Sequence, residues 1–244
     1  MVRTSRNTAP IKKLGPGKDD ANLSIILLCA GESKSDKFKY SRSLIKFDDG
    51  QSLIYKQISA IYQIFPKSEL IVVTGYDSKN VIKEIQYYTK KTRVVENENY
   101  FQTGAFRSAA LGIRAACSEN VLIIHGDLYL SKGSYETITY GASSLLVDNN
   151  NFIDDSEVGV VIHNNQITNL SYGLVDKWGQ VVYLNNKELQ IFKDLTFDDN
   201  NSRIALFEAI NMIIDKDGRF CPTYLKEKSI IEIDYPRDIK KIGI

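Results

Sequence analysis

The feature that most constrains the fold is a regular alternation of two kinds of segment between residues 24 and 125. Short apolar runs typical of buried strands are separated by longer stretches whose apolar residues recur at helical spacing. The predicted strands are 24–29, 70–75, 93–96 and 120–125, and the predicted helices are 52–65, 78–90 and 103–117. Alternation of this kind predicts a parallel sheet covered by helices.

The pattern of apolar and polar residues changes after Asp127. Shorter β-type segments at 143–147, 158–163, 166–170 and 181–184 are separated by clusters of Asn, Asp and Gly. An amphipathic helix at 202–214 and a last strand at 229–233 follow. We therefore expect an α/β fold with a Rossmann-like, doubly wound, mainly parallel sheet and a small antiparallel β addition. One domain is expected over 21–244, behind a basic tail at 1–20 that is predicted to be disordered.

Composition narrows the class of partner. With 43% hydrophobic residues the chain can fill a core, and a net charge of +1 gives no reason to expect nucleic acid. No apolar run approaches the roughly 20 residues of a membrane span. The three cysteines are widely spaced and odd in number, which favours reduced thiols in a cytoplasmic protein. Only two histidines are present, which disfavours a Ser-His-Asp hydrolase. A small-molecule partner is expected.

A basic loop follows the first predicted strand. Ala30 and Gly31 allow a sharp turn in which the backbone approaches a ligand closely. Five cations lie between residues 31 and 46 against two acids, and these cations are Lys34, Lys37, Lys39, Arg42 and Lys46. We interpret the loop as one that handles phosphate, although a lysine-rich loop can also be merely solvated.

Acidic residues lie where further predicted strands end. In a parallel sheet, ligands collect at the carboxyl ends of the strands. Asp127 follows one apolar run and Asp234 follows another, and Glu232 shares a strand face with Asp234. Carboxylates opposite a basic loop provide what a magnesium-bound triphosphate needs, namely hard oxygen ligands and cations.

At these residues the chain resembles the nucleotidyltransferases that activate sugar phosphates and phosphocholine. The resemblance covers roughly residues 23–244 and is carried by seven segments in the family's order. They are ILLCAG at 26–31, SRSLIKFDDGQSLI at 41–54, VVTGYDSKNVIKEI at 72–85, NENY at 97–100, Gly104 through Ser108 to Gly112, HGDLYL at 125–130, and EIDYPRDI at 232–239.

The resemblance implies a role for each matching residue. Catalytic roles fall to Arg42, Lys46, Asp127 and Asp234, and metal binding falls to Asp127, Glu232 and Asp234, with Mg²⁺ as the expected cofactor. Nucleotide binding is implied for Cys29, Ala30, Gly31, Gly75, Asn97, Gly104, Ser108 and Gly126.

The implied reaction transfers a nucleoside monophosphate from a nucleoside triphosphate to a small phosphorylated acceptor and releases pyrophosphate. CTP is the expected nucleotide, with UTP or dTTP as alternatives, and the acceptor is phosphocholine, a phosphonate or a sugar 1-phosphate. The segments 158–173 and 206–218 are similar to the small choline-phosphate type. Trp178, with Tyr172 and Tyr183, could face a quaternary ammonium, although core packing is the commoner role of a lone Trp. The nucleotide base, the acceptor and the oligomeric state stay open.

The opening loop departs from the family pattern. Ser33 and Ser35 stand where the family has a glycine and an arginine, and Ser41-Arg42 replaces Pro-Lys. Lys34 or Lys37 could reach the phosphates in place of that arginine, but only as a point charge. Two alternatives therefore stay open. One is an A-type glycosyltransferase, which is disfavoured because such enzymes usually carry Asp-x-Asp at the metal strand and this chain has Asp127-Leu128-Tyr129. The other is a catalytically decayed relative that binds nucleotide without turnover. A dinucleotide-binding oxidoreductase is disfavoured because no G-x-G-x-x-G follows a strand.

Overall fold

The computed structural model describes residues 12–13, 20–32, 40–89, 91–149, 155–225 and 230–242. Most of the predicted tail at 1–20 lies outside this range. So do Lys34, Lys37 and Lys39, together with Ser33 and Ser35, so the expectations for these residues remain predictions.

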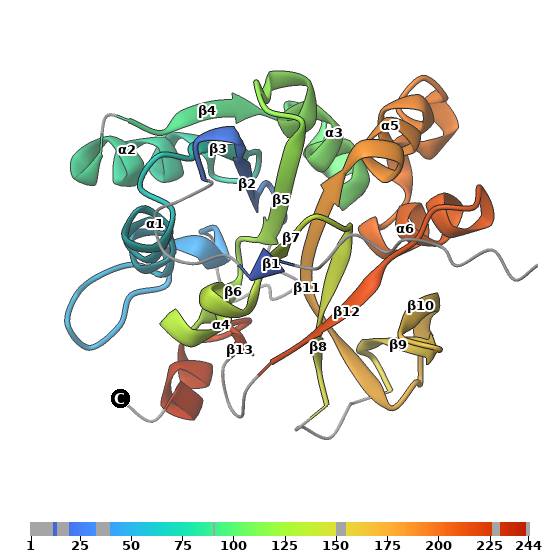
Figure 1. Ribbon diagram of the computed structural model, residues 1–244. Helices are drawn as coiled ribbons and strands as arrows, with labels where there is room; N and C mark the ends of the chain where they lie inside the picture. Colours follow the sequence, from blue (N-terminus) through green and yellow to red (C-terminus); the bar gives the residue numbers. More distant parts are fainter. Residues whose placement is uncertain are drawn as a thin grey trace, which may run out of the picture.

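A nine-stranded mixed sheet runs through the molecule (Figure 1). Its parallel part contains β2 (Ser24–Cys29), β3 (Glu69–Thr74), β4 (Arg93–Glu96) and β5 (Asn120–His125), in the order β5-β2-β3-β4. An antiparallel part begins with β11 (Asp176–Asn185) and includes β8 (Ser144–Asp148), β9 (Val158–His163) and β10 (Gln166–Tyr172). The strand β12 (Cys221–Tyr224) pairs parallel to β8. The predicted fold class is confirmed.

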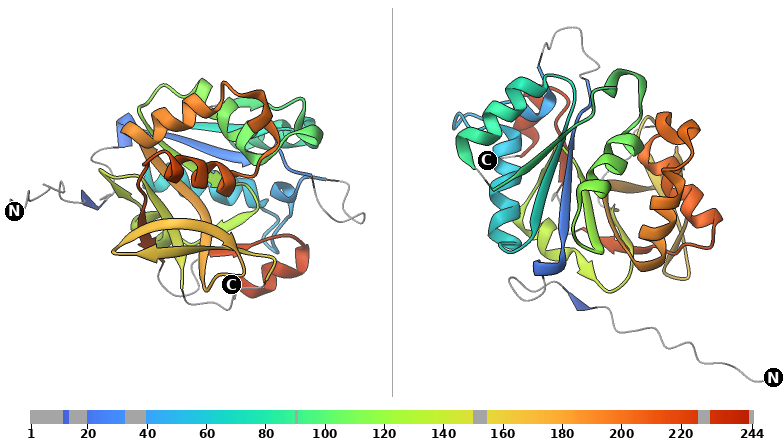
Figure 2. Two further views of the ribbon diagram at one scale, coloured as in Figure 1. Left: turned by 90° about the vertical axis from the view of Figure 1, so that its right-hand side faces the viewer. Right: turned by 90° about the horizontal axis from the view of Figure 1, so that it is seen from above.

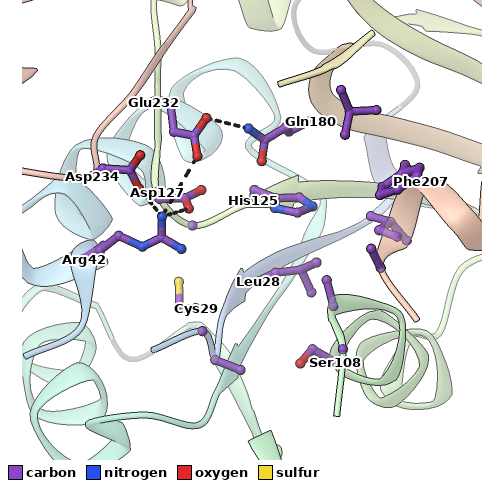
Figure 3. Close-up of a pocket in the computed structure, with 18 of the residues that line it drawn as sticks. Leu28, Cys29, Arg42, Ser108, His125, Asp127, Gln180, Phe207, Glu232 and Asp234 are labelled. Carbon is purple, nitrogen blue, oxygen red and sulfur yellow. Dashed lines mark hydrogen bonds and ion pairs between the residues drawn. The ribbon is translucent and has the colours of Figure 1, made fainter. Parts of the chain in front are cut away.

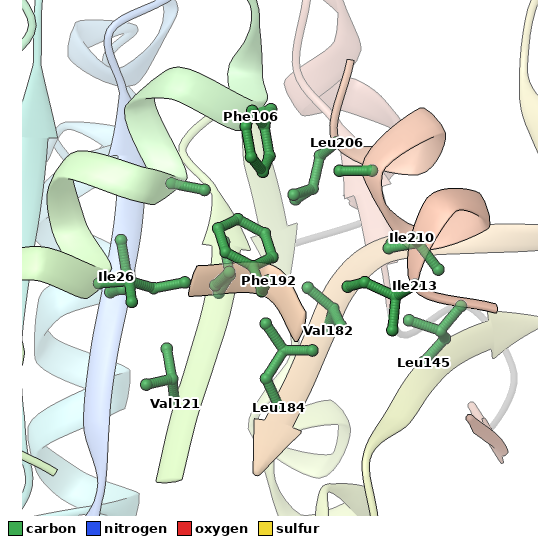
Figure 4. Packing of buried hydrophobic residues seen from close by; sticks show 14 of the residues in the cluster. Ile26, Phe106, Val121, Leu145, Val182, Leu184, Phe192, Leu206, Ile210 and Ile213 are labelled. Carbon is green, nitrogen blue, oxygen red and sulfur yellow. The ribbon is translucent and has the colours of Figure 1, made fainter. Parts of the chain in front are cut away.

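Helices cover both faces of this sheet (Figure 2). On one face lie α1 (Leu53–Ile64) and α2 (Ser78–Tyr88), and on the other lie α3 (Ala105–Ala115), α5 (Asn186–Leu195) and α6 (Leu206–Asp215). The buried strand β2 serves both layers, because Ile25 and Leu27 pack in the cluster with α1 while Ile26 packs with α3, α5 and α6 (Figure 4). A strand buried on both faces is apolar throughout, as β2 is.

A small second sheet brings the end of the chain to the carboxyl end of β5. Its strands β6 (Leu128–Leu130) and β13 (Ile230–Glu232) are antiparallel, and Glu232 stands opposite Leu128. Just beyond this pair, the Ile233 N–H donates to the Asp127 carbonyl at 2.7 Å. The helix α4 (Lys132–Thr137) follows β6, and the short strands β1 (Lys12–Lys13) and β7 (Thr139–Tyr140) pair with each other.

Short 3₁₀ turns connect several of these elements. They span Asp20–Asn22, Arg42–Leu44, Tyr100–Gln102, Asp199–Arg203 and Pro236–Ile242. In the part of the chain that the structure describes, no helix combines the length and the apolar character needed to cross a membrane.

The start of one helix agrees with the sequence prediction and the start of another does not. Helix α2 begins at Ser78 as predicted, and Asp77, with a positive φ of 56°, precedes it as the cap residue. The Ser78 hydroxyl lies 3.0 Å from the Thr74 hydroxyl. The helix predicted at 202–214 begins at Leu206, because the Glu208 carboxylate accepts from the Ala205 N–H at 2.6 Å and caps the helix there.

Candidate active site

The candidate site lies where the strand order reverses. From β2 the chain moves outward to β3 and β4 and then returns to β5 on the other side of β2, so the ends of β2 and β5 form the crevice of a topological switch point. The two ends are tightly joined, since the Gly126 N–H donates to the Leu28 carbonyl at 2.8 Å. A Cβ on Gly126 would lie 2.5 Å from the Cys29 sulfur, so only glycine fits.

Three carboxylates converge at this crevice. Asp127 follows β5, Glu232 ends β13 and Asp234 lies two residues further along. One oxygen from each of them lies within 4.8 Å of the others. The structure therefore brings together the three residues that the sequence suggested as metal ligands.

Arg42 lies among these carboxylates (Figure 3). Its Nη1 is 2.9 Å from Asp127 Oδ2 and 4.0 Å from Glu232 Oε1, and it donates a hydrogen bond to Asp234 Oδ1. Burial alone would lower the pKa of Arg42, but Asp127, Asp234 and Glu232 outweigh burial, so the pKa is raised. In this arrangement the guanidinium partly neutralises the acidic cluster.

The cluster has the properties of a site for a hard divalent cation. Burial, followed by the charges of Asp127 and Asp234, raises the pKa of Glu232 to about 7. Asp127 Oδ1 is buried and has no hydrogen-bond partner among the described residues. An unsatisfied carboxylate oxygen beside two further carboxylates provides the oxygen ligands that Mg²⁺ prefers. The residues present therefore fit the expected ion.

A cleft of about 640 Å³ opens over the acidic cluster. On the side of β2 and α3 its lining includes Ala30, Gly31, Tyr100, Thr103, Gly104 and Ser108. On the side of β11 and α6 its lining includes Glu157, Tyr172, Lys177, Trp178, Gln180 and Phe207. Cys29, Arg42, His125, Gly126 and the three carboxylates lie between the two sides.

The β2 side is built from backbone and hydroxyl groups. Among the residues that the structure describes, an added Cβ at Gly31 would meet nothing closer than Arg42 Nη2 at 3.8 Å, which leaves room for a ligand beside this backbone. Asn97 donates from one amide nitrogen to Thr103 Oγ1 at 3.0 Å and to Ser108 Oγ at 3.1 Å. This network fixes two hydroxyls of the cleft wall.

Some predicted site residues do not line the cleft. Lys46 is exposed and pairs with Ser52. Asn97 is buried and holds the Thr103 and Ser108 hydroxyls by hydrogen bonds. Gly75 allows Ala30 and Tyr100 to come close, because a Cβ on Gly75 would lie 2.7 Å from Tyr100 Cβ. Cys29 lines the cleft as a buried thiol, and burial raises its pKa to about 12.

Sequence reasoning did not select several residues of the β11 side. Lys177 lines the cleft and pairs with Glu157, and Gln180 donates to Glu232 Oε2 at 2.9 Å. Gln180 has a positive φ of 53° and lies where the register between β11 and β8 shifts. Lys177 is the residue that could have been noticed, because it is a cation directly beside Trp178, which the sequence had already singled out.

The suggested aromatic group is only partly assembled. Trp178 lines the cleft but is 3% exposed, and its Nε1 donates to the Val181 carbonyl at 3.3 Å. Tyr183 does not line it, and its hydroxyl donates to Asn120 at 2.7 Å. Tyr172 lies beside Phe207 with ring centroids 5.4 Å apart.

One known protein family matches the chain in sequence. Residues 39–193 match the family described as "Domain of unknown function (DUF6564)". No curated protein matches the chain in sequence.

Several solved structures share the fold. The inositol-1-phosphate CTP transferase from T. maritima aligns with a TM-score of 0.71 at 18% identity, over 90% of this chain and 94% of that chain. The CTP:phosphocholine cytidylyltransferase from Streptococcus pneumoniae aligns with a TM-score of 0.69 at 17% identity, over 91% and 97%. A nucleoside-diphosphate-sugar pyrophosphorylase from Vibrio cholerae RC9 aligns with a TM-score of 0.69 at 11% identity, over 90% and 98%. The predicted nucleotidyltransferase fold is thereby confirmed.

Proposed function

The chain belongs to the family described as "Domain of unknown function (DUF6564)", and because that description assigns no activity, we propose one from the site: a Mg²⁺-dependent nucleotidyltransferase. It transfers a nucleoside monophosphate from a nucleoside triphosphate to a small phosphorylated acceptor and releases pyrophosphate. The observation that carries the proposal is the convergence of Asp127, Glu232 and Asp234 with Arg42 at the floor of the cleft.

The residues of the chain divide this work between binding and neutralisation of charge. Asp127, Glu232 and Asp234 would hold Mg²⁺, which supplies neutralisation of phosphate charge and orientation of the triphosphate when bound. Arg42 provides a planar cation that can contact two phosphate oxygens at once. The acceptor phosphate is already an anion, so no protein nucleophile is needed and the chain contributes mainly positioning.

The two sides of the cleft suit the two substrates. The β2 side offers the open backbone of Gly31 and the Ser108 hydroxyl, which suit the nucleotide at a topological switch point. The β11 side then receives the acceptor, and Lys177, which lines this side and pairs with Glu157, supplies a cation for the acceptor phosphate. CTP is the proposed nucleotide, with UTP or dTTP as alternatives, and the acceptor is phosphocholine, a phosphonate or a sugar 1-phosphate.

Two other functions predict different results. An A-type glycosyltransferase would consume a nucleotide-sugar without releasing pyrophosphate. A decayed relative would bind nucleotide without turnover, and the departures from the family pattern at Ser33 and Ser35 favour it. Against decay stands the complete acidic cluster, in which Arg42 contacts all three acids.

One experiment distinguishes these functions. The protein is incubated with Mg²⁺ and each of CTP, UTP and dTTP against phosphocholine, 2-aminoethylphosphonate, glucose 1-phosphate and inositol 1-phosphate, and pyrophosphate is measured. Release with one pair is the expected result. Binding of nucleotide without release from any pair would favour the decayed relative.

A further inference from the structure

His125 is a polar group that the proposed reaction leaves unused. It is the last residue of β5 and lies two residues before Asp127. Its Nε2 is buried and has no hydrogen-bond partner among the described residues. Buried polar atoms in folded proteins nearly always have a partner, so an atom of this kind in the lining of a cleft indicates that a ligand supplies it.

Contacts fix the backbone of His125 and pack against its ring. Gln57 donates to the His125 carbonyl at 3.1 Å and to the Leu128 carbonyl at 2.7 Å, which fixes the end of β5. The indole of Trp178 meets the imidazole edge to face, with ring centroids 5.8 Å apart. Figure 3 shows the imidazole between the carboxylates and the apolar wall that contains Leu28 and Phe207.

The position of His125 assigns it to the acceptor. The strand β5 lies between β2, which serves the nucleotide side, and β11, which carries Trp178 and Gln180. Trp178, which packs against the imidazole, and Gln180, which contacts Glu232, both come from β11, so His125 adjoins the β11 side of the cleft. An acceptor whose phosphate lies near the acidic cluster would place its remaining atoms over the imidazole.

We propose that His125 selects acceptors that carry a hydroxyl group, so that this enzyme uses a polyol phosphate in preference to a quaternary ammonium phosphate. The proposal rests on the nucleotidyltransferase function proposed above. A hydroxyl can both donate to and accept from imidazole nitrogens, whereas a trimethylammonium group can do neither. Two groups in the cleft lining that could hold a quaternary ammonium are already engaged, since Trp178 is 3% exposed and the Glu157 carboxylate is paired with Lys177.

Acceptor kinetics of His125 variants test the proposal. Pyrophosphate release with CTP and Mg²⁺ is measured for glucose 1-phosphate, inositol 1-phosphate and phosphocholine. The wild type should prefer one of the hydroxylated acceptors. His125→Phe should lower kcat/KM for that acceptor by about 10- to 100-fold, mainly through KM, while the affinity for CTP is unchanged. His125→Gln, which keeps hydrogen-bonding groups, should recover part of the loss.

The second histidine provides a matched control. His163 is exposed on β9, and His163→Phe should leave acceptor preference as it is in the wild type. A wild-type preference for phosphocholine would overturn the proposal, and so would an unchanged acceptor ranking in His125→Phe.

A binding measurement separates this inference from the proposed function and needs no change at His125. In protein labelled with ¹⁵N-histidine, His163→Phe assigns the imidazole signals of the two histidines. Inositol 1-phosphate or glucose 1-phosphate should shift the His125 signal, and phosphocholine should not. If no acceptor gives pyrophosphate, the proposed function fails, but a hydroxyl-dependent shift would still support the selection by His125. If neither hydroxylated phosphate shifts the signal, the selection itself is wrong.

Discussion

Asp127 and Asp234 come from distant parts of the sequence and contact the same guanidinium nitrogen of Arg42. Asp127→Asn keeps the shape of the side chain but removes a charge that the proposed metal site needs. We expect pyrophosphate release to fall by about 100-fold or more, because the loss of charge acts directly on the stabilisation of the transferred phosphoryl group. The measurement is the steady-state rate with the preferred acceptor, beside thermal unfolding to show that the fold is retained.

Glu136 supplies the control for this substitution. Its side chain is exposed on α4, away from the cleft lining. Glu136→Gln should retain the full rate. If Asp127→Asn also retained it, the assignment of the metal site would be wrong.

The raised pKa of Glu232 predicts how the metal-free protein responds to pH. Burial and then the charges of Asp127 and Asp234 raise this pKa from 4.5 to about 7 in the folded state. The fold therefore favours the protonated form, and the contribution of Glu232 to stability is full below pH 4.5 and is lost as pH rises through 7. Glu232→Gln should remove this pH dependence, which we expect to be a fall on the order of 3 kcal/mol in the free energy of unfolding between pH 4.5 and pH 7.

Denaturant unfolding in EDTA between pH 5 and pH 8 measures this effect. Added Mg²⁺ should reverse it at pH 8 in the wild type, because bound metal favours ionised carboxylates. An identical pH dependence of stability in the wild type and in Glu232→Gln would contradict the prediction.

Individual site residues differ in how visible they are from sequence. Asp127 was predictable because it directly follows an apolar run whose end lies at the ligand edge of the sheet. Gln180 was not, because its direction depends on a positive φ and on the shifted register between β11 and β8. Lys46 is the opposite case. The resemblance to the family predicted a catalytic role for it, but it forms a β-bridge with Ser52, is exposed and does not line the cleft.

Among the elements, α3 packs unusually closely on the parallel strands. At Gly112 an added Cβ would lie 2.5 Å from Ile26 Cγ2 and 3.1 Å from Val73 Cγ2. Gly112→Ala gains helix propensity of about 1 kcal/mol, but the crowding pushes α3 away from β2 and costs roughly 1–3 kcal/mol. We expect a net loss of stability together with weaker nucleotide binding, because the displaced helix carries Ser108.

The same substitution in another helix separates crowding from propensity. Gly133 lies in α4, where an added Cβ would meet only Ser131 Oγ, at 3.8 Å. Gly133→Ala should therefore be neutral or slightly stabilising. Thermal unfolding and nucleotide titration of both variants make the comparison. Equal effects of the two substitutions would show that close packing of α3 is not what matters.

The elements themselves were largely readable from sequence. The strands β2, β4, β5 and β9 have the predicted ends, because each is a compact apolar or β-branched run between turn residues. The helix α5 was missed, since its residues follow β11 without a break and its N-terminal Asn186 has a positive φ of 44°. The antiparallel direction of β11 depends on pairing with β5, which no local pattern specifies.

For the molecule as a whole, the continuous sheet predicts a single cooperative unit. The strands run without interruption from β10 through β11 and β5 to β4, and one apolar cluster joins residues of β2, β5, β11 and α6. Residues 21–244 should therefore unfold in one transition by both circular dichroism and Trp178 fluorescence.

Because the cleft is lined by both the parallel strands and β11, a ligand that contacts both sides stabilises that whole unit. With Mg²⁺ and CTP at about 100 times the dissociation constant, the stabilisation should be about 2.7 kcal/mol, which corresponds to a rise in Tm of roughly 5–10 °C. Asp127→Asn should lose most of this rise. Two separate transitions, of which only one moves with CTP, would show that the β8–β11 region folds independently of the nucleotide side.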